Sequence, residues 1–265
     1  MRKLGMNFRA ERPKDKTDEE ILARMKEYGF GAIFTGMPEP ERLAELAPKV
    51  RAAGLDYDFI HAPFKGINTI WEEGEEGEEM LNRLLATVDG CAKNEIPIVV
   101  IHLSSGVGAP MINDLGVERF DRLIRHAGTV GVKVAMENQR KIGNIAALME
   151  RYTAEQHVGF CWDNGHEACF TPGREYMPLF GDRLLCLHIH DNRCLYNVDE
   201  HYLPFDGLID FRRVADHIRA SGYRGSVMLE TKGRGRGLYM GLTEEEFLER
   251  AYMQANRLRV LIDGE

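Results

Sequence analysis

The sequence predicts an α/β protein built as one (β/α)8 barrel, a TIM barrel, over residues 1–265. Short apolar runs alternate with amphipathic helical stretches along the whole chain. The runs are rich in Val, Ile and Leu, as expected for parallel strands that are buried on both faces. Eight strand–helix pairs fit the 265 residues well, because this fold typically needs about 250 residues.

The predicted strands end where polar or glycine residues begin. They span residues 3–8, 31–37, 55–64, 96–103, 132–138, 157–163, 184–191 and 225–231. An open doubly wound sheet is the alternative arrangement for the same alternation. In its dinucleotide-binding form that fold carries GxGxxG after the first strand, and no such motif stands there. We therefore favour the closed barrel, with no linker and no second domain.

A helical stretch follows each predicted strand. The first opens at Thr17, a candidate N-cap followed by acidic residues, and the second ends at Gly54, a C-cap signal. The helical signal is weakest in residues 175–183. The predicted helices span residues 17–30, 39–54, 77–94, 118–131, 141–152, 175–183, 211–222 and 243–262.

Composition limits the classes of function. The formal net charge of −8 argues against nucleic acid as a partner, because such proteins usually carry a basic footprint. No apolar run approaches the roughly 20 residues that span a bilayer, and the N-terminal segment lacks the apolar core of a signal peptide. We therefore expect a cytoplasmic protein without a membrane partner. The five cysteines form no CxxC pair, which disfavours a zinc–thiolate site. Association into a homo-oligomer stays open.

Histidine, aspartate or glutamate side chains close six of the eight predicted strands, and a later loop adds two more. Because the C-terminal ends of barrel strands meet at one face, we expect these side chains to share a single pocket. One strand-end histidine is usually structural, but several carboxylates and imidazoles together indicate a divalent metal site. The residues are His61, His102, Glu137, Asp163, His166, His188, His190 and Glu230, with Asp199 and His201 in the loop.

The ordered motifs HAPF, IHLSSG, MENQ, DNGH, HIHDN, DEH and LETKG resemble the xylose isomerase-like barrel superfamily over roughly residues 1–260. This superfamily includes sugar and sugar-phosphate isomerases, ketose 3-epimerases, inositol-pathway dehydratases and endonuclease IV. The resemblance implies one divalent ion (Mn²⁺, Zn²⁺, Co²⁺ or Mg²⁺) and no organic cofactor. The metal ligands that it implies are Glu137, Asp163, His188 and Glu230. His188 is preferred over His190 because the first histidine of the matching family motif is the ligand.

The resemblance further implies an isomerase or epimerase of a small sugar, sugar phosphate or polyol derivative. Glu137 and Glu230 would then remove and return a proton through an enediolate. The residues implied to bind substrate are His61, His102, His166 and Arg193, and those implied for an additional metal ion are Asp199 and His201. The glycine-rich loop at residues 231–241 carries Arg234 and Arg236, from which we predict contact with an anionic substrate, because such loops often bind phosphate.

Endonuclease IV, a phosphodiesterase that acts on abasic DNA with three zinc ions, is the main alternative. The chain has a counterpart for each of its nine ligands: His61, His102, Glu137, Asp163, His166, His188, Asp199, His201 and Glu230. The acidic charge and the absence of basic or aromatic loops that penetrate DNA favour the sugar enzyme. A non-catalytic metal-binding barrel is the third and least favoured hypothesis.

Overall fold

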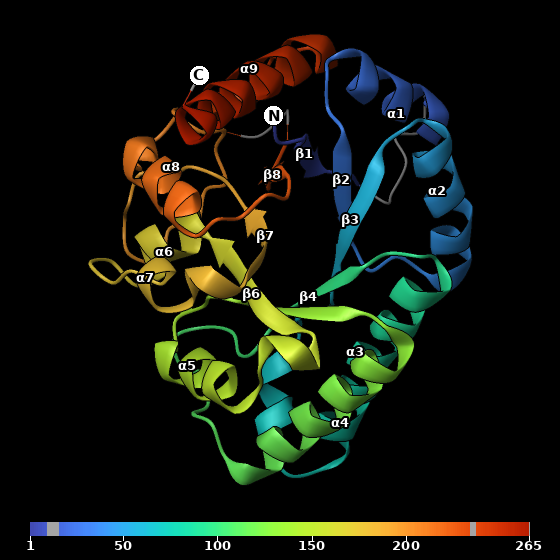
Figure 1. Cartoon of the computed structure of the whole chain (residues 1–265), viewed down its shortest axis with the longest axis vertical. Helices are drawn as coiled ribbons and strands as arrows, with labels where there is room; N and C mark the ends of the chain where they lie inside the picture. The colour runs from blue at the N-terminus through green and yellow to red at the C-terminus, as the bar shows by residue number, and fades with distance from the viewer. Residues whose placement is uncertain (10–15, 234–236, 265) are drawn as a thin grey trace.

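The computed structural model describes residues 1–9, 16–233 and 237–264, and it contains the predicted barrel (Figure 1). Eight parallel strands lie in the order β7-β6-β5-β4-β3-β2-β1-β8. They are β1 Leu4–Asn7, β2 Ala32–Gly36, β3 Asp56–His61, β4 Ile98–His102, β5 Lys133–Glu137, β6 Val158–Asp163, β7 Leu184–His188 and β8 Val227–Leu229.

The barrel closes between β7 and β8 just beyond the end of β7. Ile189 and Leu229 form a parallel bridge there. The Ile189 N–H donates to the Met228 carbonyl at 2.9 Å, and the Glu230 N–H donates to the Ile189 carbonyl at 2.9 Å. These bonds lie at the C-terminal ends of the two strands, so they also fix the backbone beside the strand-end histidines.

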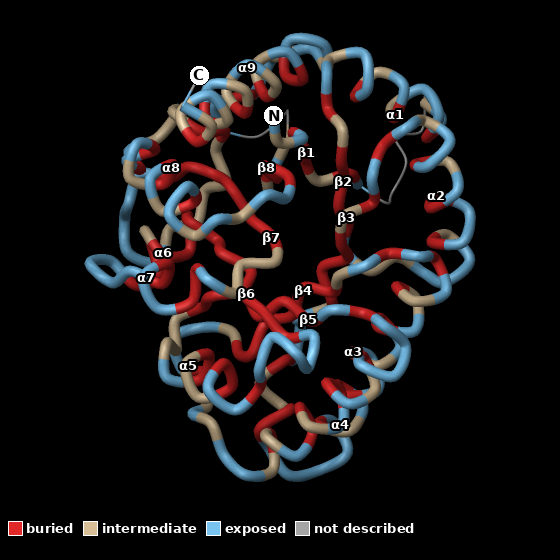
Figure 2. Tube along the Cα trace, viewed as in Figure 1, coloured by how far each residue is buried: buried red, intermediate tan, exposed pale blue. Residues whose placement is uncertain are grey.

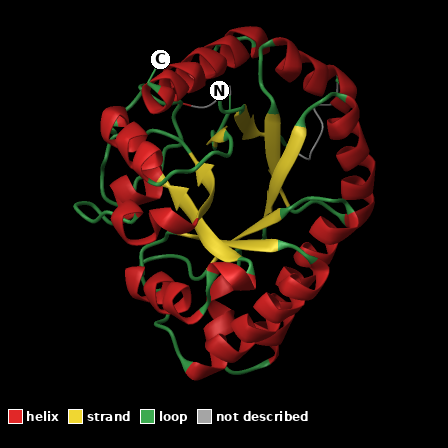
Figure 3. Cartoon of the chain, viewed as in Figure 1, coloured by secondary structure: helices red, strands yellow, loops and turns green. Residues whose placement is uncertain are grey.

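Helices surround the strands on the outside of the barrel (Figure 3). Their ends follow the expected capping chemistry: Thr17 forms a capping box with Glu20, and Asn113 accepts a hydrogen bond from the Gly116 N–H. The helices are α1 Asp18–Glu27, α2 Pro40–Ala52, α3 Glu75–Lys93, α4 Asp114–Val130, α5 Ile142–Arg151, α6 Asn164–Phe170, α7 Met177–Phe180, α8 Phe211–Ala220 and α9 Glu244–Asp263.

Three differences between predicted and observed elements bear on the site. The helix expected over residues 175–183 shrinks to α7 and a short 3-10 turn, because Pro178 restricts its first turn and Gly181 follows it. Strand β7 ends at His188 rather than at residue 191, since the chain then turns to form the closing bridge. Helix α6 starts directly after β6, with Asp163 as its N-cap, in a segment for which no helix was predicted.

The apolar core has two parts. One lies between strands and helices, and Figure 2 shows the strands mostly buried. The other fills the barrel interior and contains Phe34, Phe59, Cys161, Cys186 and Met228 among its members. All five cysteines, each within the described residues, are unpaired, and Cys161 and Cys186 are buried there as small apolar residues, as predicted.

Within the described ranges, no helix combines the length and the apolar character that crossing a membrane requires. The cytoplasmic location expected from the sequence stays a prediction.

The start of α4 depends on a glycine. Trp71 is buried against Gly116, and its indole Nε1–H donates to the Leu103 carbonyl at 2.6 Å. The Asn113 side chain joins the same contact, because its amide donates to the Trp71 carbonyl at 2.7 Å. A Cβ at Gly116 would lie 1.9 Å from the Trp71 ring, closer than any real contact.

Replacing Gly116 with alanine should therefore lower the free energy of unfolding by about 1–3 kcal/mol, the usual effect of overpacking a core. Chemical denaturation measures this change. Gly128→Ala in the same helix is the control, because the nearest atom to its added Cβ lies at 4.0 Å. That variant should gain about 0.5–1 kcal/mol from helix propensity. Equal stability of the two variants would contradict the packing argument.

Candidate metal centre

Four strand-end side chains meet at the C-terminal face of the barrel. They come from the ends of β5, β6 and β7 and from the residue after β8. One ligand atom from each lies within 4.8 Å of the others. The structure therefore brings together the four predicted ligands of a single ion: Glu137, Asp163, His188 and Glu230. We call these residues the first ligand group.

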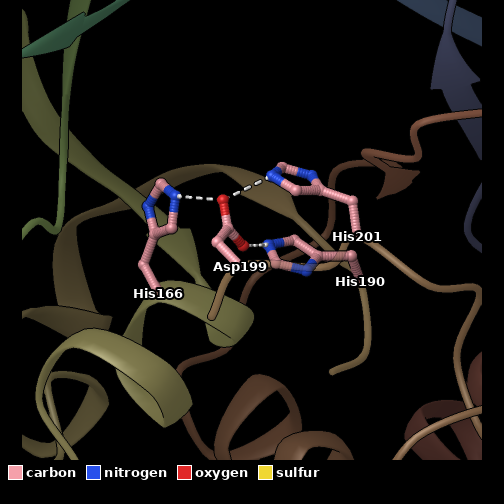
Figure 4. Close-up of side chains that lie close together, drawn as sticks. All are labelled: His166, His190, Asp199 and His201. Carbon is pink, nitrogen blue, oxygen red and sulfur yellow. Dashed lines mark hydrogen bonds and ion pairs between the residues drawn. The ribbon is translucent and has the colours of Figure 1, made fainter. Parts of the chain in front are cut away.

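A second ligand group lies beside the first and consists of His166, His190, Asp199 and His201. Figure 4 shows the Asp199 carboxylate between the three imidazoles. One carboxylate oxygen of Asp199 is 2.7 Å from His201 Nε2 and 3.7 Å from His166 Nε2. The other oxygen is 3.8 Å from His190 Nε2. This group contains both residues predicted for an additional ion, Asp199 and His201.

His61 and His102 reach the first group through Glu137. Their Nε2 atoms are each 3.1 Å from Glu137 Oε2 and 3.1 Å from one another. The opposite ring nitrogen of His61, Nδ1, donates to the Ala62 carbonyl at 2.8 Å. This bond leaves the Nε2 lone pair of a neutral His61 ring directed at the centre, as in metal-bound histidines.

The DNGH motif places two side chains through the start of α6. Asp163 Oδ1 accepts the His166 backbone N–H at 2.6 Å, and His190 Nε2 lies 3.0 Å from the same carboxylate oxygen. The glycine of the motif is required, because a Cβ at Gly165 would lie 1.9 Å from the His190 ring. Gly165 therefore allows His190 to pack against α6 and join the second group.

The loop that carries Asp199 and His201 is anchored at its two ends. The buried Asp191 carboxylate accepts hydrogen bonds from the backbone N–H groups of Asn192, Gly207 and Ile209. His201 itself has a positive φ of 53°, a backbone conformation that is uncommon outside glycine. Its Nδ1 donates to the Glu230 carbonyl at 3.1 Å, so its Nε2 faces Asp199.

Sequence reasoning missed two members of the site. His190 was recognised as a strand-end residue but not assigned as a ligand, although its alternation with His188 places both on the same side. Gln139 was not singled out. Its amide nitrogen lies 3.4 Å from Glu137 Oε1 and 3.0 Å from His166 Nδ1, so it connects the two groups. Gln139 could have been found in the sequence as the last polar residue of the MENQ motif.

One predicted substrate-binding residue, Arg193, is not brought into this cluster. The guanidinium of Arg193 pairs with the Glu200 carboxylate at 2.7 Å, and its side chain is 56% exposed. The fixed turn after Asp191 directs it to the surface. Arg234, like Arg236, lies outside the described residues. A contact between either arginine and substrate stays a prediction.

Burial and charge set the protonation of the first group. Burial alone would raise the pKa of Glu137, but the adjacent His102 and His188 hold it well below its ordinary value. Burial would also raise the pKa of Asp163, but His166 and His190 lower it to about 2. For His188 burial would lower the pKa, yet Glu230 and Glu137 raise it to about 10. Without a metal ion, Glu137 and Asp163 are therefore anionic and His188 is protonated at neutral pH.

The residues fit a bound divalent cation. Several buried polar atoms at the centre have no hydrogen-bond partner among the described residues, and such atoms are costly unless they are coordinated or bonded. They include both ring nitrogens of His188, Nδ1 of His190, Oδ1 of Asp199 and Oε2 of Glu230. Imidazole nitrogens and carboxylate oxygens are the ligands that Zn²⁺, Mn²⁺ and similar ions take in proteins.

Three curated proteins are similar in sequence. The protein y4fM of Sinorhizobium fredii is 28% identical over 249 residues, covering 80% of this chain and 77% of its own length. Inosose dehydratase of Erwinia tasmaniensis is 23% identical, with 83% of this chain and 84% of the relative covered. A probable endonuclease 4 of Cenarchaeum symbiosum is 24% identical, with 64% and 68% covered.

Solved structures share the fold at low sequence identity. A D-tagatose 3-epimerase-like protein superposes with a TM-score of 0.76 at 16% identity, covering 98% of both chains. D-psicose 3-epimerase from Clostridium cellulolyticum superposes with a TM-score of 0.74 at 15% identity, covering 98% of this chain and 99% of its own.

The sequence profile of one protein family matches residues 22–254, which is most of the sequence. The match agrees with the fold and with the resemblance inferred from the strand-end motifs. The chain belongs to the xylose isomerase-like TIM barrel family.

Proposed function

We propose that this protein is a divalent-metal-dependent isomerase or epimerase that acts on a small sugar, sugar phosphate or polyol derivative. The observation that carries the proposal is the first ligand group, in which Glu137 and Glu230 lie on either side of the same histidine. His188 Nδ1 is 3.5 Å from a carboxylate oxygen of each. The similarity to structures of ketose 3-epimerases supports the same class of reaction.

Glu137, Asp163, His188 and Glu230 would hold the ion. When bound, such a cation stabilises negative charge that develops on a substrate oxygen. The chain itself supplies the proton carriers. Glu230 lines an open cavity and its side chain is 21% exposed, so its carboxylate can take a proton from a bound substrate. Glu137 is only 1% exposed and serves as the second carboxylate of the pair.

The remaining polar residues bind and orient. His61 lines the same cavity as Glu230, where its Nε2 can accept a hydrogen bond from a substrate hydroxyl, and His102 lies beside it. We further propose that the second ligand group holds an additional ion, with His166 and His190 joining Asp199 and His201. His166 Nδ1 lies 3.0 Å from Glu137 Oε1, so it connects the additional ion to the first group.

A nuclease of the endonuclease IV type is the alternative, because all nine of its expected ligands lie in the two ligand groups and in the adjoining cluster of His61, His102 and Glu137. The cluster shares Glu137 with the first group, and the two ligand groups touch through His166 and Asp163. The net charge of −8 disfavours DNA as the substrate. Incubating the Zn²⁺- or Mn²⁺-loaded protein with depurinated plasmid separates the two functions. The isomerase proposal expects no nicking. At least one nick per protein molecule would support the nuclease instead.

Replacing either Glu137 or Glu230 by glutamine should lower turnover by at least about 10²-fold, because each change removes a proton carrier. The measurement is solvent deuterium incorporation into a substrate found by screening the Mn²⁺-loaded protein against ketoses and inositol derivatives. Glu150→Gln, on the exposed face of α5, is the control and should keep full activity. Near wild-type turnover in Glu137→Gln or Glu230→Gln would refute the paired-glutamate mechanism.

Metal binding should release protons and should strengthen as the pH rises. The pKa of His188 is raised to about 10 and that of His166 is raised well above its ordinary value, so both rings are protonated at neutral pH before the ion binds. A ligand imidazole must be neutral, and the ion therefore displaces these protons. Calorimetric titration with Mn²⁺ in buffers of different ionisation enthalpy measures the number released. Identical heats in all buffers would show that no protons are released and would contradict this prediction.

The same titration tests the second group. Asp199→Asn should lower the number of bound ions from two to one, because it removes the only carboxylate among three histidines. Glu200→Gln is the control, since Glu200 neighbours Asp199 but pairs with Arg193. An unchanged stoichiometry in Asp199→Asn would leave the first group as the single site.

A further inference from the structure

A cavity of about 610 Å³ extends sideways from the first ligand group. Glu230 and His61 form its inner end. Its other walls come from the C-terminal ends of β1, β2 and β3 and from the segments that follow them. They consist of Asn7, Phe8, Arg9, Phe34, Gly36, Met37, Pro38, Glu39, Arg42 and Phe64.

Aromatic and other apolar side chains form about half of the walls of this cavity. Phe8 and Phe34 are buried, whereas Phe64 is 47% exposed. The Phe64 ring stacks on His102 with centroids 4.5 Å apart, which holds it at the edge of the ligand group. Exposed aromatic rings bury much apolar surface when a ligand covers them.

The charged residues that line the cavity do not favour an anion. Arg9 and Arg42 are balanced by Glu39 and Glu230. Arg42 already makes a two-point ion pair with the buried carboxylate of Asp18. An apolar group therefore fits this wall better than a phosphate or a carboxylate.

The size of the cavity exceeds what one sugar ring needs. Cavities of about 300–1,000 Å³ usually hold ligands of drug size. Gly36 keeps the space open, because it is exposed at the end of β2 and a Cβ added there meets no atom within 4 Å. Its φ is not in the left-handed region, so glycine is not required there by backbone strain. The absence of a side chain at Gly36 leaves room for a ligand.

We propose that the substrate is a carbonyl-bearing sugar with an apolar, preferably aromatic, substituent away from the reacting carbonyl, such as an aryl glycoside of a keto sugar. This inference rests on the proposed function for the sugar, whose oxygens are bound at the first ligand group. The substituent occupies the cavity between Phe8, Met37 and Phe64. Gly36 is then a specificity-determining residue, because any larger side chain would fill the space that the substituent takes.

The test measures binding and not turnover, so it is separate from the test of the paired glutamates. Phenyl and methyl glycosides of glucose and galactose are titrated into the Mn²⁺-supplemented full-length protein. For at least one sugar, the phenyl glycoside should bind about tenfold or more tightly than its methyl counterpart, the usual scale of discrimination by an apolar pocket.

Substitution at Gly36 tests whether the preference for the phenyl glycoside arises in this cavity. Gly36→Leu should raise the Kd of the phenyl glycoside at least about tenfold and leave that of the methyl glycoside within twofold. Gly36→Ala should raise the Kd of the phenyl glycoside by a smaller factor. This variant tests the same position if the leucine variant does not fold. Gly108→Leu is the matched control, since Gly108 also has open space around it and does not line the cavity.

Two results would overturn the proposal. One is that no phenyl glycoside binds more tightly than its methyl counterpart. The other is a phenyl preference that survives in both Gly36 variants. Loss of turnover in Glu137→Gln together with an intact phenyl preference would support both the mechanism and the cavity. A phenyl preference without any turnover would keep the cavity and reject the isomerase.

Discussion

The buried carboxylate of Glu137 is the constraint on which the site depends. A carboxylate with 1% exposure is stable only when positive or donating groups surround it. His61, His102, His166 and Gln139 all reach its two oxygens within 3.4 Å. The partners come from the ends of β3 and β4 and from the segments after β5 and β6, so satisfying this one anion requires that these four neighbouring strands pair in register.

The two ligand groups are held by different kinds of structure. The first group rests on strand ends, whose spacing is fixed by the backbone hydrogen bonds of the sheet. The second group rests on a glycine contact and on a loop. Gly165 gives His190 its space, and Asp191 anchors the loop that carries Asp199 and His201. Small changes in these supports therefore alter the second group while the first keeps its geometry.

The site is also asymmetric in polarity. Towards β6 and β7 it is lined by histidines and carboxylates, and towards β1 and β2 it opens into the cavity that Phe8, Phe34 and Phe64 line in part. Glu230 and His61 stand on the boundary between the two regions. The difference in polarity between the two regions orients a ligand that spans the boundary, because its oxygens bind on the polar side and its apolar part packs on the other.

The sequence by itself determined the barrel, because alternating apolar runs and helical periods are local patterns. It also predicted one shared pocket for the strand-end histidines and acids, since the C-terminal ends of parallel strands must share one face, and the family resemblance of the motifs implied the first ligand group among them. Only the tertiary structure decided which histidines belong together. His188 and His190 are two residues apart, yet they enter different groups, because β7 ends at His188 and the Gly165 contact places the next ring. The surface position of Arg193 and the space beside Gly36 likewise depend on how distant segments pack, and no local pattern records that packing.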